Sequence, residues 1–480
     1  MTHAENPLLA LFEKAPDVRP WLNVGCLLDI PTGVIYRGKH GNSIVNGGLP
    51  KITGVGGRGN MYKSTISHHY SLSALAKYIR SILVAHDTEG SGSPMRYCTL
   101  AQGFEEIAGL DLVREGRLSF SDLTVMFGSK WFDQLRALVS MKIKDSKTYI
   151  RETPFLDASG KPIMAMLPTI GELDGISQMT IEEVSKLYDK AEVGDSELNA
   201  EAMRSSMAKN QMLLQMPYLT GSGGLYMLIT AHVGDEIIMD KYAGDKKKLS
   251  FMKGNIKFKA TPEKFTFLTD VLLYCRSLEI LINQTTKAPE FPRDSNDNIK
   301  GDTDLQAITV QYLRNKQGKT GGTFDIVVSQ SEGVKEGLTN LRYLRQNKES
   351  SSSPGWGMGG HDKGYYCELY PDVKMQRTTA RRLCDNDYKL NRALEISCEV
   401  HQLLHNSHHR LESKYYCTME ELYTQLKEAG YDWDVLLETS KHWCYVEDED
   451  DRRPELSTVD ILRMRLPKDD PDYYKPYWMK

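Results

Sequence analysis

The sequence predicts an α/β protein whose twisted, mainly parallel sheet is flanked by helices. Two observations predict this class. From residue 52 to about residue 329, apolar strand-like runs alternate with longer helical stretches, which is typical of a parallel sheet buried on both faces. The chain also has 480 residues, of which 40% are apolar and 26% charged, so it can enclose a large core and at least one smaller unit.

The apolar pattern predicts the individual elements. We expect strands in six runs: KITGVGG (51–57), SILVAHD (81–87), PIMAMLPTI (162–170), LYMLITAHV (225–233), DVLLYC (270–275) and FDIVVSQ (324–330). We expect helices over residues 6–15, 65–80, 198–215, 374–404 and 418–428. The resulting organisation is a short N-terminal segment (1–45) that can contact another protomer, an α/β core (46–345), a Ser- and Gly-rich linker (346–360) and a mostly helical C-terminal region (361–480) of unknown role.

Composition and charge exclude several classes of protein. The formal net charge is −4, so any contact with DNA must come from a local basic patch. The sequence has no run of about 18 apolar residues and no basic segment followed by an apolar block at its N-terminus, so neither a membrane span nor a secretory signal is expected. The eight cysteines form no CxxC pair, which indicates reduced thiols and a cytoplasmic protein.

A phosphate-binding loop is predicted between the first strand and the helix that follows it. The spacing GxxxxxK[ST] places backbone N–H groups and a helix N-terminus around phosphates. Lys63 would reach the β- and γ-phosphates of ATP, and Ser64 would hold Mg²⁺. Tyr62 stands where a second glycine is usual, and the alternative is a glycine-rich turn with a chance Lys-Ser pair. The predicted nucleotide-binding residues of the loop are Gly57, Arg58, Gly59, Asn60, Met61, Tyr62, Lys63, Ser64 and Thr65.

Polar residues end two further strands. The second strand ends in Asp87-Thr88-Glu89-Gly90-Ser91, and a carboxylate at the carboxyl edge of a parallel sheet can orient and polarise an attacking water. Glu89 is therefore a predicted catalytic residue, with a capped turn as the alternative. His232 ends a later strand and is predicted to sense the γ-phosphate, unless it is only a strand-end histidine.

The third strand departs from the usual pattern of such ATPases. We expect it over residues 163–167, which puts the metal-binding Walker B aspartate at Pro168. Proline cannot bind a metal ion, so the sequence predicts slow hydrolysis. Asp174, Glu172 or Asp87 would have to compensate, and the sequence does not choose among them.

Taken in order, these motifs resemble those of the RecA/Rad51 family, and most closely its phage UvsX branch. Asp87-Thr88-Glu89-Gly90 is similar to the catalytic strand of the family, while an aromatic residue at 62 and a histidine at 232 are UvsX-like traits. The resemblance covers roughly residues 20–345 and leaves the C-terminal region unmatched. It implies a RecA-like core that binds ATP and Mg²⁺, and the host cytoplasm if a phage encodes the chain.

The resemblance also implies which residues meet the nucleotide from outside the loop. In RecA-like assemblies ATP lies between protomers, so a homo-oligomer is expected. Arg314 and Lys316 resemble the basic pair that one protomer offers to its neighbour's ATP, as an arginine finger does. Arg96, after the catalytic strand, is expected among the nucleotide-binding residues.

Two segments are predicted to bind single-stranded DNA. Residues 194–196, ahead of the helix at 198–215, resemble the first DNA-binding loop of RecA. Residues 235–262 interleave lysines, which neutralise phosphates, with aromatic side chains, which stack on bases. The alternative for the second segment is a solvated lysine-rich loop. The predicted DNA contacts are Gly194, Asp195, Ser196, Lys241, Tyr242, Lys246, Lys247, Lys248, Phe251 and Lys253.

One helix face of the C-terminal region carries Cys398, His401 and His405. These three side chains could bind zinc, with Cys417 or Cys384 as a fourth ligand. Because paired CxxC spacing is absent, we favour an apolar helix face with polar residues in the core.

The favoured function is a recombinase, a slow DNA-dependent ATPase that forms a helical filament on single-stranded DNA for homologous strand exchange and repair. A mediator or single-strand-binding protein would be a further partner. The alternative is a ring-shaped hexameric replicative helicase of the same superfamily, because residues 314–322 also resemble its basic hairpin. A third hypothesis is a weakly hydrolysing DNA-binding scaffold, motivated by Pro168.

Overall fold

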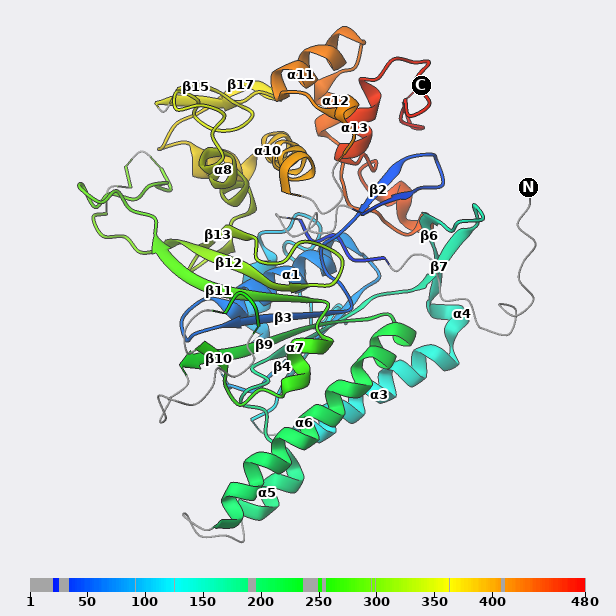
Figure 1. The fold of residues 1–480 in the computed structure, drawn as a ribbon, viewed down its shortest axis with the longest axis vertical. Coiled ribbons are helices and arrows are strands. Elements are labelled where there is room, and N and C mark those ends of the chain that lie inside the picture. The colour runs from blue at the N-terminus through cyan, green and yellow to red at the C-terminus, as the bar shows by residue number, and fades with distance from the viewer. Residues whose placement is uncertain are drawn as a thin grey trace.

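A ten-stranded sheet forms the centre of the molecule, a computed structural model (Figure 1). Its strand order is β14-β13-β12-β11-β3-β9-β8-β4-β5, and β10 pairs with β9. The strands β11, β3, β9, β8, β4 and β5 run parallel, whereas β12, β13, β14 and β10 pair antiparallel. The predicted α/β class, with its mainly parallel sheet, is confirmed. The structure describes residues 20–25, 34–90, 92–124, 126–188, 196–235, 249–252, 256–294, 296–297, 299–361, 363–406 and 411–479.

Five strands of the central sheet, β3, β4, β9, β11 and β13, coincide with predicted apolar runs, whereas β5, β10, β12 and β14 were not predicted. The parallel strands are β3 (Ile52–Gly57), β4 (Ile82–Asp87), β5 (Leu118–Asp122), β8 (Thr169–Asp174), β9 (Leu225–Asp235) and β11 (Val271–Ile280). The antiparallel strands are β10 (Ile256–Phe258), β12 (Leu305–Asn315), β13 (Thr323–Ser329) and β14 (Gly333–Val334). Every residue of β3 and β8 is buried, as expected for strands covered on both faces.

Two hydrophobic clusters cover the two faces of the sheet. In β9, Met227 and Ile229 belong to one cluster and Leu228 to the other, because successive side chains of a strand point to opposite faces. One cluster includes residues of α3 (Gly128–Lys144), α5 (Glu182–Tyr188), α6 (Ser196–Gly223) and α7 (Glu263–Leu268). The other includes residues of α1 (Lys63–Lys77), α2 (Pro94–Ala101) and the C-terminal helices.

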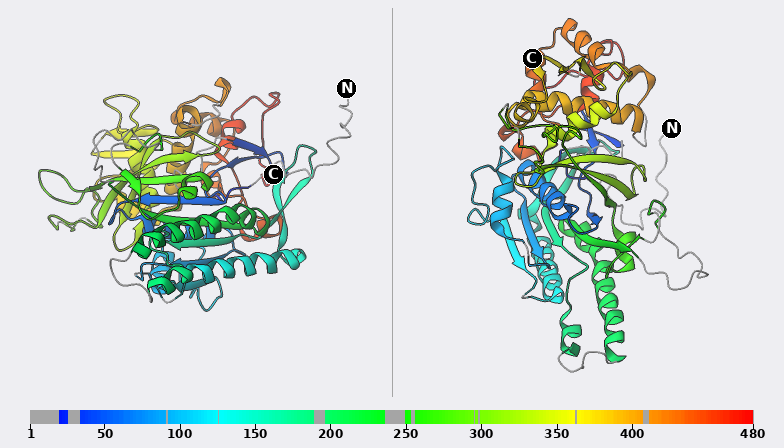
Figure 2. Two further views of the ribbon diagram at one scale, coloured as in Figure 1. Left: turned by 60° about the horizontal axis from the view of Figure 1, so that its bottom comes forward. Right: turned by 90° about the vertical axis from the view of Figure 1, so that its left-hand side faces the viewer.

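The first of these faces carries a long helical arm. α6 is 28 residues long and lies beside α3, and Figure 2 shows α5 and the start of α6 reaching beyond the sheet. The predicted helix at 198–215 is thus confirmed as part of α6. At the other end of α3, α4 (Ser146–Tyr149) leads into a hairpin of β6 (Ile150–Leu156) and β7 (Pro162–Met166). None of the helices in the described ranges is both long and apolar enough to cross a bilayer.

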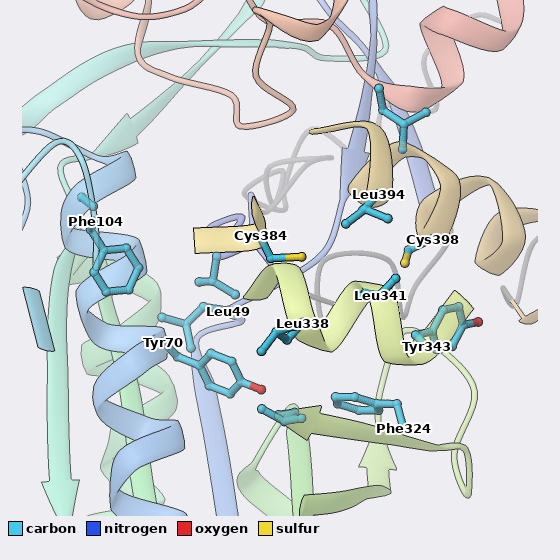
Figure 3. Packing of buried hydrophobic residues seen from close by; sticks show 14 of the residues in the cluster. Leu49, Tyr70, Phe104, Phe324, Leu338, Leu341, Tyr343, Cys384, Leu394 and Cys398 are labelled. Atoms are coloured by element: carbon cyan, nitrogen blue, oxygen red, sulfur yellow. The ribbon is translucent and has the colours of Figure 1, made fainter. Parts of the chain in front are cut away.

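The C-terminal region packs on the core rather than beside it. One buried cluster runs from Trp21 to Tyr474, and Figure 3 shows Leu338, Leu341 and Leu394 between the sheet and the C-terminal helices. Trp356, in the segment predicted as a linker, is 8% exposed and belongs to this cluster.

Helices dominate this region, as predicted, together with one small sheet. The strands are β15 (Met358–His361), β16 (Gly364–Cys367) and β17 (Tyr370–Met375), and β1 (Val34–Arg37) pairs with β2 (Ser43–Asn46) nearby. The α-helices are α8 (Glu336–Gln346), α9 (Ala380–Asn386), α10 (Tyr388–His401), α11 (Met419–Glu428), α12 (Trp433–Leu437) and α13 (Thr458–Met464). A short π-helix, η3 (Gln402–Asn406), and two 3-10 helices, η4 (Ser413–Tyr415) and η5 (Val446–Asp451), accompany them.

Two predicted elements are wrong in their bounds. The helix predicted from residue 374 begins at Ala380, because residues 370–375 form an edge strand. The third strand of the central sheet is β8, from Thr169, whereas residues 163–166 belong to the β6–β7 hairpin. Pro168 separates these two strands, since it has no N–H to donate to a ladder. The apolar run at 162–170 therefore contains β7 and the start of β8, and not one strand. The helix expected at 6–15 lies outside the described residues.

Candidate functional site

The predicted phosphate loop connects β3 to α1 at the carboxyl edge of the sheet. β3 ends at Gly57 and α1 begins at Lys63, whose ammonium group donates to the carbonyl of Arg58 at 2.9 Å. α1 has neither a side-chain N-cap nor an acidic residue in its first turn. Its first N–H groups and the positive end of its dipole therefore face the loop, which suits a phosphate group.

Tyr62 adopts a backbone conformation that favours glycine. Its φ is 54° and its ψ is 27°, a left-handed conformation that costs a non-glycine residue about 1–2 kcal/mol. The phenol forms a side-chain hydrogen bond with Gln306 of β12, and burial raises its pKa. This contact offsets part of the backbone cost, so the loop tolerates tyrosine at this position.

Asp174 faces the loop from the end of β8 and replaces Pro168 as the candidate metal-binding residue. Its carboxylate is 6% exposed and accepts hydrogen bonds from Thr230 Oγ1 at 2.6 Å and from the Ser64 hydroxyl. Burial raises the pKa of Asp174, a cost that a nearby cation would relieve. A hydroxyl and a carboxylate supply the oxygen ligands that Mg²⁺ takes alongside water and phosphate. The residues present therefore fit this ion.

The other two carboxylates considered for this role are already occupied. Glu172 is fully buried, with His68 Nδ1 at 2.7 Å from Oε1 and the Ser71 hydroxyl donating to Oε2 at 2.6 Å. Burial alone would raise the pKa of Glu172, but the imidazole and the serine hydroxyls reverse the shift and lower it. Asp87 accepts the backbone N–H groups of Glu89 and Gly92 at 2.8 and 2.5 Å, so it shapes the turn after β4.

Glu89 and His232, predicted separately, are in direct contact. Glu89 Oε1 lies 2.6 Å from His232 Nε2, and both side chains are about a quarter exposed, at 28% and 26%. The sheet order β9-β8-β4 places the ends of their strands on either side of Asp174. Thr88 fastens the turn, because its hydroxyl donates to the carbonyls of Asp174 and Gly175 at 2.9 and 2.6 Å.

Arg96 borders the site on the side of β13. Its guanidinium donates to the carbonyls of Ser331 and Gln330 at 3.0 and 3.2 Å. A cavity of about 520 Å³ opens nearby, and its lining includes Thr65, at the start of α1, and Ser331. This volume lies in the range of small-molecule pockets.

Arg314 and Lys316 lie at the opposite end of the sheet. Arg314 lies next to the last residue of β12, Asn315, and Lys316 follows it. β12 runs antiparallel to β11, so Asn315 pairs with Val271 at the amino end of the parallel strands. Lys316 forms an ion pair with Asp270 at 2.8 Å. The chain therefore does not bring these two residues to its own phosphate loop.

Most of the predicted DNA contacts cannot be placed. Gly194, Asp195, Lys241, Tyr242, Lys246, Lys247, Lys248 and Lys253 lie outside the described residues. Ser196 begins α6. Phe251 is 36% exposed and its ring lies over Gly321, where a Cβ atom would come within 2.5 Å of it.

In the C-terminal region, Cys398 and His401 form hydrogen bonds with other buried residues. Cys398 Sγ donates to the carbonyl of Asn340 at 3.4 Å, and His401 Nδ1 lies 2.8 Å from the Tyr343 hydroxyl. Burial lowers the pKa of His401 to about 4. Within the described ranges, no three His, Cys, Asp or Glu side chains are grouped so as to hold a metal ion. The favoured interpretation, a packed helix face, agrees with these contacts.

Sequence reasoning missed the residues that connect the site. Thr230 links Asp174 to β9 through its hydroxyl, which also accepts the N–H of Gly175 at 2.7 Å. Ser177 accepts the N–H of His232 at 3.0 Å. Neither residue belongs to a recognisable motif, and the hydroxyl of each contacts residues more than 50 positions away in the chain, so no local signal identified it.

Comparison with known proteins gives a limited result. No protein-family model matches the sequence, and no curated protein matches it. Among solved structures, the crystal structure of the RadB recombinase is similar over 60% of this chain and 92% of the recombinase chain, with 14% sequence identity and a TM-score of 0.31.

Proposed function

We propose that this chain is an ATPase of the RecA type that binds single-stranded DNA and acts as a recombinase. One observation carries the proposal. The loop residues Lys63 and Ser64 meet Asp174 and the Glu89–His232 pair at one edge of a parallel sheet, where ligands of such sheets bind. The order of these motifs along the chain, which resembles the RecA/Rad51 family, supports the same function.

In this proposal, each side chain has a distinct task in phosphoryl transfer. Lys63 leaves the Arg58 carbonyl and pairs with the β- and γ-phosphates of ATP. Ser64 and Asp174 hold Mg²⁺, which neutralises phosphate charge when bound. Glu89 accepts a hydrogen bond from the attacking water and takes its proton, while His232 holds the carboxylate in place.

The position of Asp174 also changes the expected rate. Slow hydrolysis and the scaffold hypothesis both followed from Pro168, which lies between two strands and not at the carboxyl edge. We propose that Asp174 performs the metal-binding role, so the chain needs no replacement for a missing aspartate.

Assembly completes the site in this proposal. Arg314 and Lys316 lie at the end of the sheet remote from the phosphate loop, so they can reach ATP only in another copy. A head-to-tail contact of this kind repeats as a filament or closes as a ring. Lys316 lies in the turn between β12 and β13, where Gly321 N donates to the Tyr312 carbonyl at 2.7 Å. The resemblance of residues 314–322 to the basic hairpin of the helicases keeps that function as the second candidate.

The test is ATP hydrolysis with and without single-stranded DNA, in the wild type and in Glu89→Gln. The wild type should hydrolyse ATP faster with DNA. Glu89→Gln keeps the shape and loses the base, so it should bind ATP normally and lose about 10²–10⁴-fold in turnover. Glu115→Gln, at an exposed position outside the site, is the matched control and should behave as wild type. Electron microscopy of Glu89→Gln with ATP and DNA then separates filaments from rings. A wild type without any ATP hydrolysis contradicts the proposal.

A further inference from the structure

Lys209 is a buried lysine in an unusual place. It lies on α6, is 4% exposed, and has no ion-pair partner among the described residues. Its ammonium group donates to the carbonyls of Ile176 and Ser177, at 3.0 and 3.4 Å. Burial lowers its pKa to about 8. Burying an ammonium group costs free energy that an apolar side chain would not. Packing alone therefore does not explain lysine here.

The carbonyls that Lys209 binds belong to the turn that follows Asp174. Ile176 N donates to the carbonyl of Thr230 at 3.0 Å, so this turn is fastened to β9. Ser177 Oγ accepts the N–H of His232 at 3.0 Å and lies 3.0 Å from Thr261 Oγ1. His232 in turn contacts Glu89 at 2.6 Å.

Ser177 is thus the point where three parts of the chain meet. His232 precedes the lysine-rich segment 235–262 near its start, and Thr261 stands at its end. Lys209 comes from α6, the helix that follows the first predicted DNA-binding loop. The chain around both predicted DNA-binding segments therefore converges on one residue beside the predicted catalytic pair: Lys209 binds the Ser177 carbonyl, and His232 and Thr261 contact its hydroxyl.

A second connection between the lysine-rich segment and the site is weaker. Arg58 pairs with Asp235 at 2.7 Å, but the two side chains are 52% and 60% exposed. Exposed ion pairs of this kind contribute little, since water and salt screen them. The buried contacts of Lys209 and Ser177 are the stronger route.

We infer that Lys209 is a positioning residue that couples DNA binding at α6 to the Glu89–His232 pair through Ser177. A movement of α6 on DNA shifts the 176–177 carbonyls, and with them the backbone of His232 and the carboxylate of Glu89. The inference rests on the proposed ATPase function and names the regulation of that same site. The ammonium group of Lys209 binds the backbone carbonyls of Ile176 and Ser177 and acts on Glu89 only through them, so its effect is on stimulation and not on basal turnover.

A second buried lysine provides a matched control. Lys142, on α3, is 3% exposed, and burial lowers its pKa to about 8 as well. Its ammonium group also binds a backbone carbonyl, that of Leu167, at 2.6 Å, and the Thr169 hydroxyl at 3.1 Å. Thr169 begins β8, so Lys142 makes the same kind of contact at the other end of the strand that ends in Asp174.

The experiment compares Lys209→Met with Lys142→Met in the full chain, using ATP hydrolysis with and without single-stranded DNA. Lys209→Met should keep basal hydrolysis and lose about fivefold or more of the DNA stimulation, the size of a typical coupling between sites. Lys142→Met should keep both. Lys209→Arg, which retains the donors, should restore stimulation at least in part.

A binding measurement gives an independent readout. Coupling between two ligands is reciprocal, so a non-hydrolysable ATP analogue should raise the affinity of the wild type for single-stranded DNA. In Lys209→Met the ratio of DNA affinities with and without the analogue should fall by about fivefold or more. If Lys209 has only a structural role, Lys209→Met should lower the stability of the protein and leave this ratio unchanged.

The outcomes separate this inference from the proposed function. A wild type that hydrolyses no ATP, or is not stimulated by DNA, overturns the proposed function and this inference with it. A stimulated wild type with an equally stimulated Lys209→Met overturns the inference alone. Equal loss of stimulation in Lys209→Met and Lys142→Met also overturns it. If Lys209→Met does not fold, Ser177→Ala removes only the hydroxyl contacts, and normal stimulation in that variant overturns the inference.

Discussion

The two ends of the parallel strands differ sharply in chemistry although the same strands build both. At the carboxyl end lie Ser64, Asp174 and the Glu89–His232 pair, together with the uncapped N-terminus of α1. At the amino end a groove of about 910 Å³ is lined largely by apolar side chains, among them Met164 and Met166. In a parallel sheet with right-handed crossovers, the carboxyl ends of the strands and the N-termini of the helices that follow them lie at the same edge. The direction of the strands therefore separates these two surfaces.

Positive charges are used differently at the two ends. At the amino end, Lys316 pairs with Asp270 at 2.8 Å and Lys51 lies 3.8 Å from the centre of the Tyr226 ring. At the carboxyl end, Lys63 donates to the Arg58 carbonyl and forms no ion pair within the part of the chain that the structure describes, so a phosphate can displace this acceptor. This difference is consistent with the proposed function, in which ATP binds at the carboxyl end and another copy contacts the amino end.

The largest expected effect distinguishes Lys63, in the loop after the carboxyl end of β3, from Lys51, just before its amino end. Lys63→Ala removes the mobile positive charge of the phosphate loop and should lower ATP turnover by about 10²–10³-fold. Lys51→Ala, just before the start of β3, should leave turnover unchanged. Steady-state hydrolysis and equilibrium ATP binding measure both variants. If both substitutions lowered ATP turnover equally, the assignment of ATP binding to the carboxyl end would be wrong.

A smaller effect concerns the acid stability of the carboxyl end. Burial lowers the pKa of His86, near the end of β4, to about 4, whereas the pKa of an unfolded histidine is about 6.5. The unfolded state therefore binds the extra proton first, and stability is lost as pH falls from about 6.5 towards 4, by about 3 kcal/mol. Denaturant unfolding at pH 7 and pH 4.5 should show a smaller loss in His86→Gln than in wild type.

The control for the acid prediction is His361→Gln, at an exposed position of β15. This variant should lose as much stability as the wild type between the two pH values. A wild-type acid loss that is the same in His86→Gln would show that other groups are responsible for it.

The smallest effect tests whether the two ends meet in an assembly. Glu89→Gln and Arg314→Ala should each be inactive alone. The first variant lacks the base at the carboxyl end, and the second lacks the arginine that the amino end offers to the next copy. In an equal mixture, about a quarter of head-to-tail contacts would pair an intact Glu89 with an intact Arg314. Hydrolysis by the mixture should therefore recover to about a quarter of the wild-type rate. No recovery above either variant alone would contradict a site shared between copies.

The sequence placed five strands of the central sheet correctly and misplaced the third. The strands at β3, β4, β9, β11 and β13 follow from apolar runs, and the structure places the predicted loop residues, Glu89 and His232 at the carboxyl edge of the sheet. The third strand was misplaced because residues 162–170 read as one apolar run, and Asp174 was then left outside it. Only the pairing of β8 with β9 and β4 shows which part of that run enters the sheet.

The sequence by itself determined the class of fold and identified a candidate phosphate loop, because strand length, helix period and a Lys-Ser pair after a glycine-rich loop are local properties of the chain. Tertiary structure alone decided which carboxylate faces Ser64, that Glu89 touches His232, and that Lys209 reaches the turn after Asp174. Those contacts join residues tens to more than a hundred positions apart. Sheet order and helix packing bring them together, and neither leaves a periodic trace in the sequence.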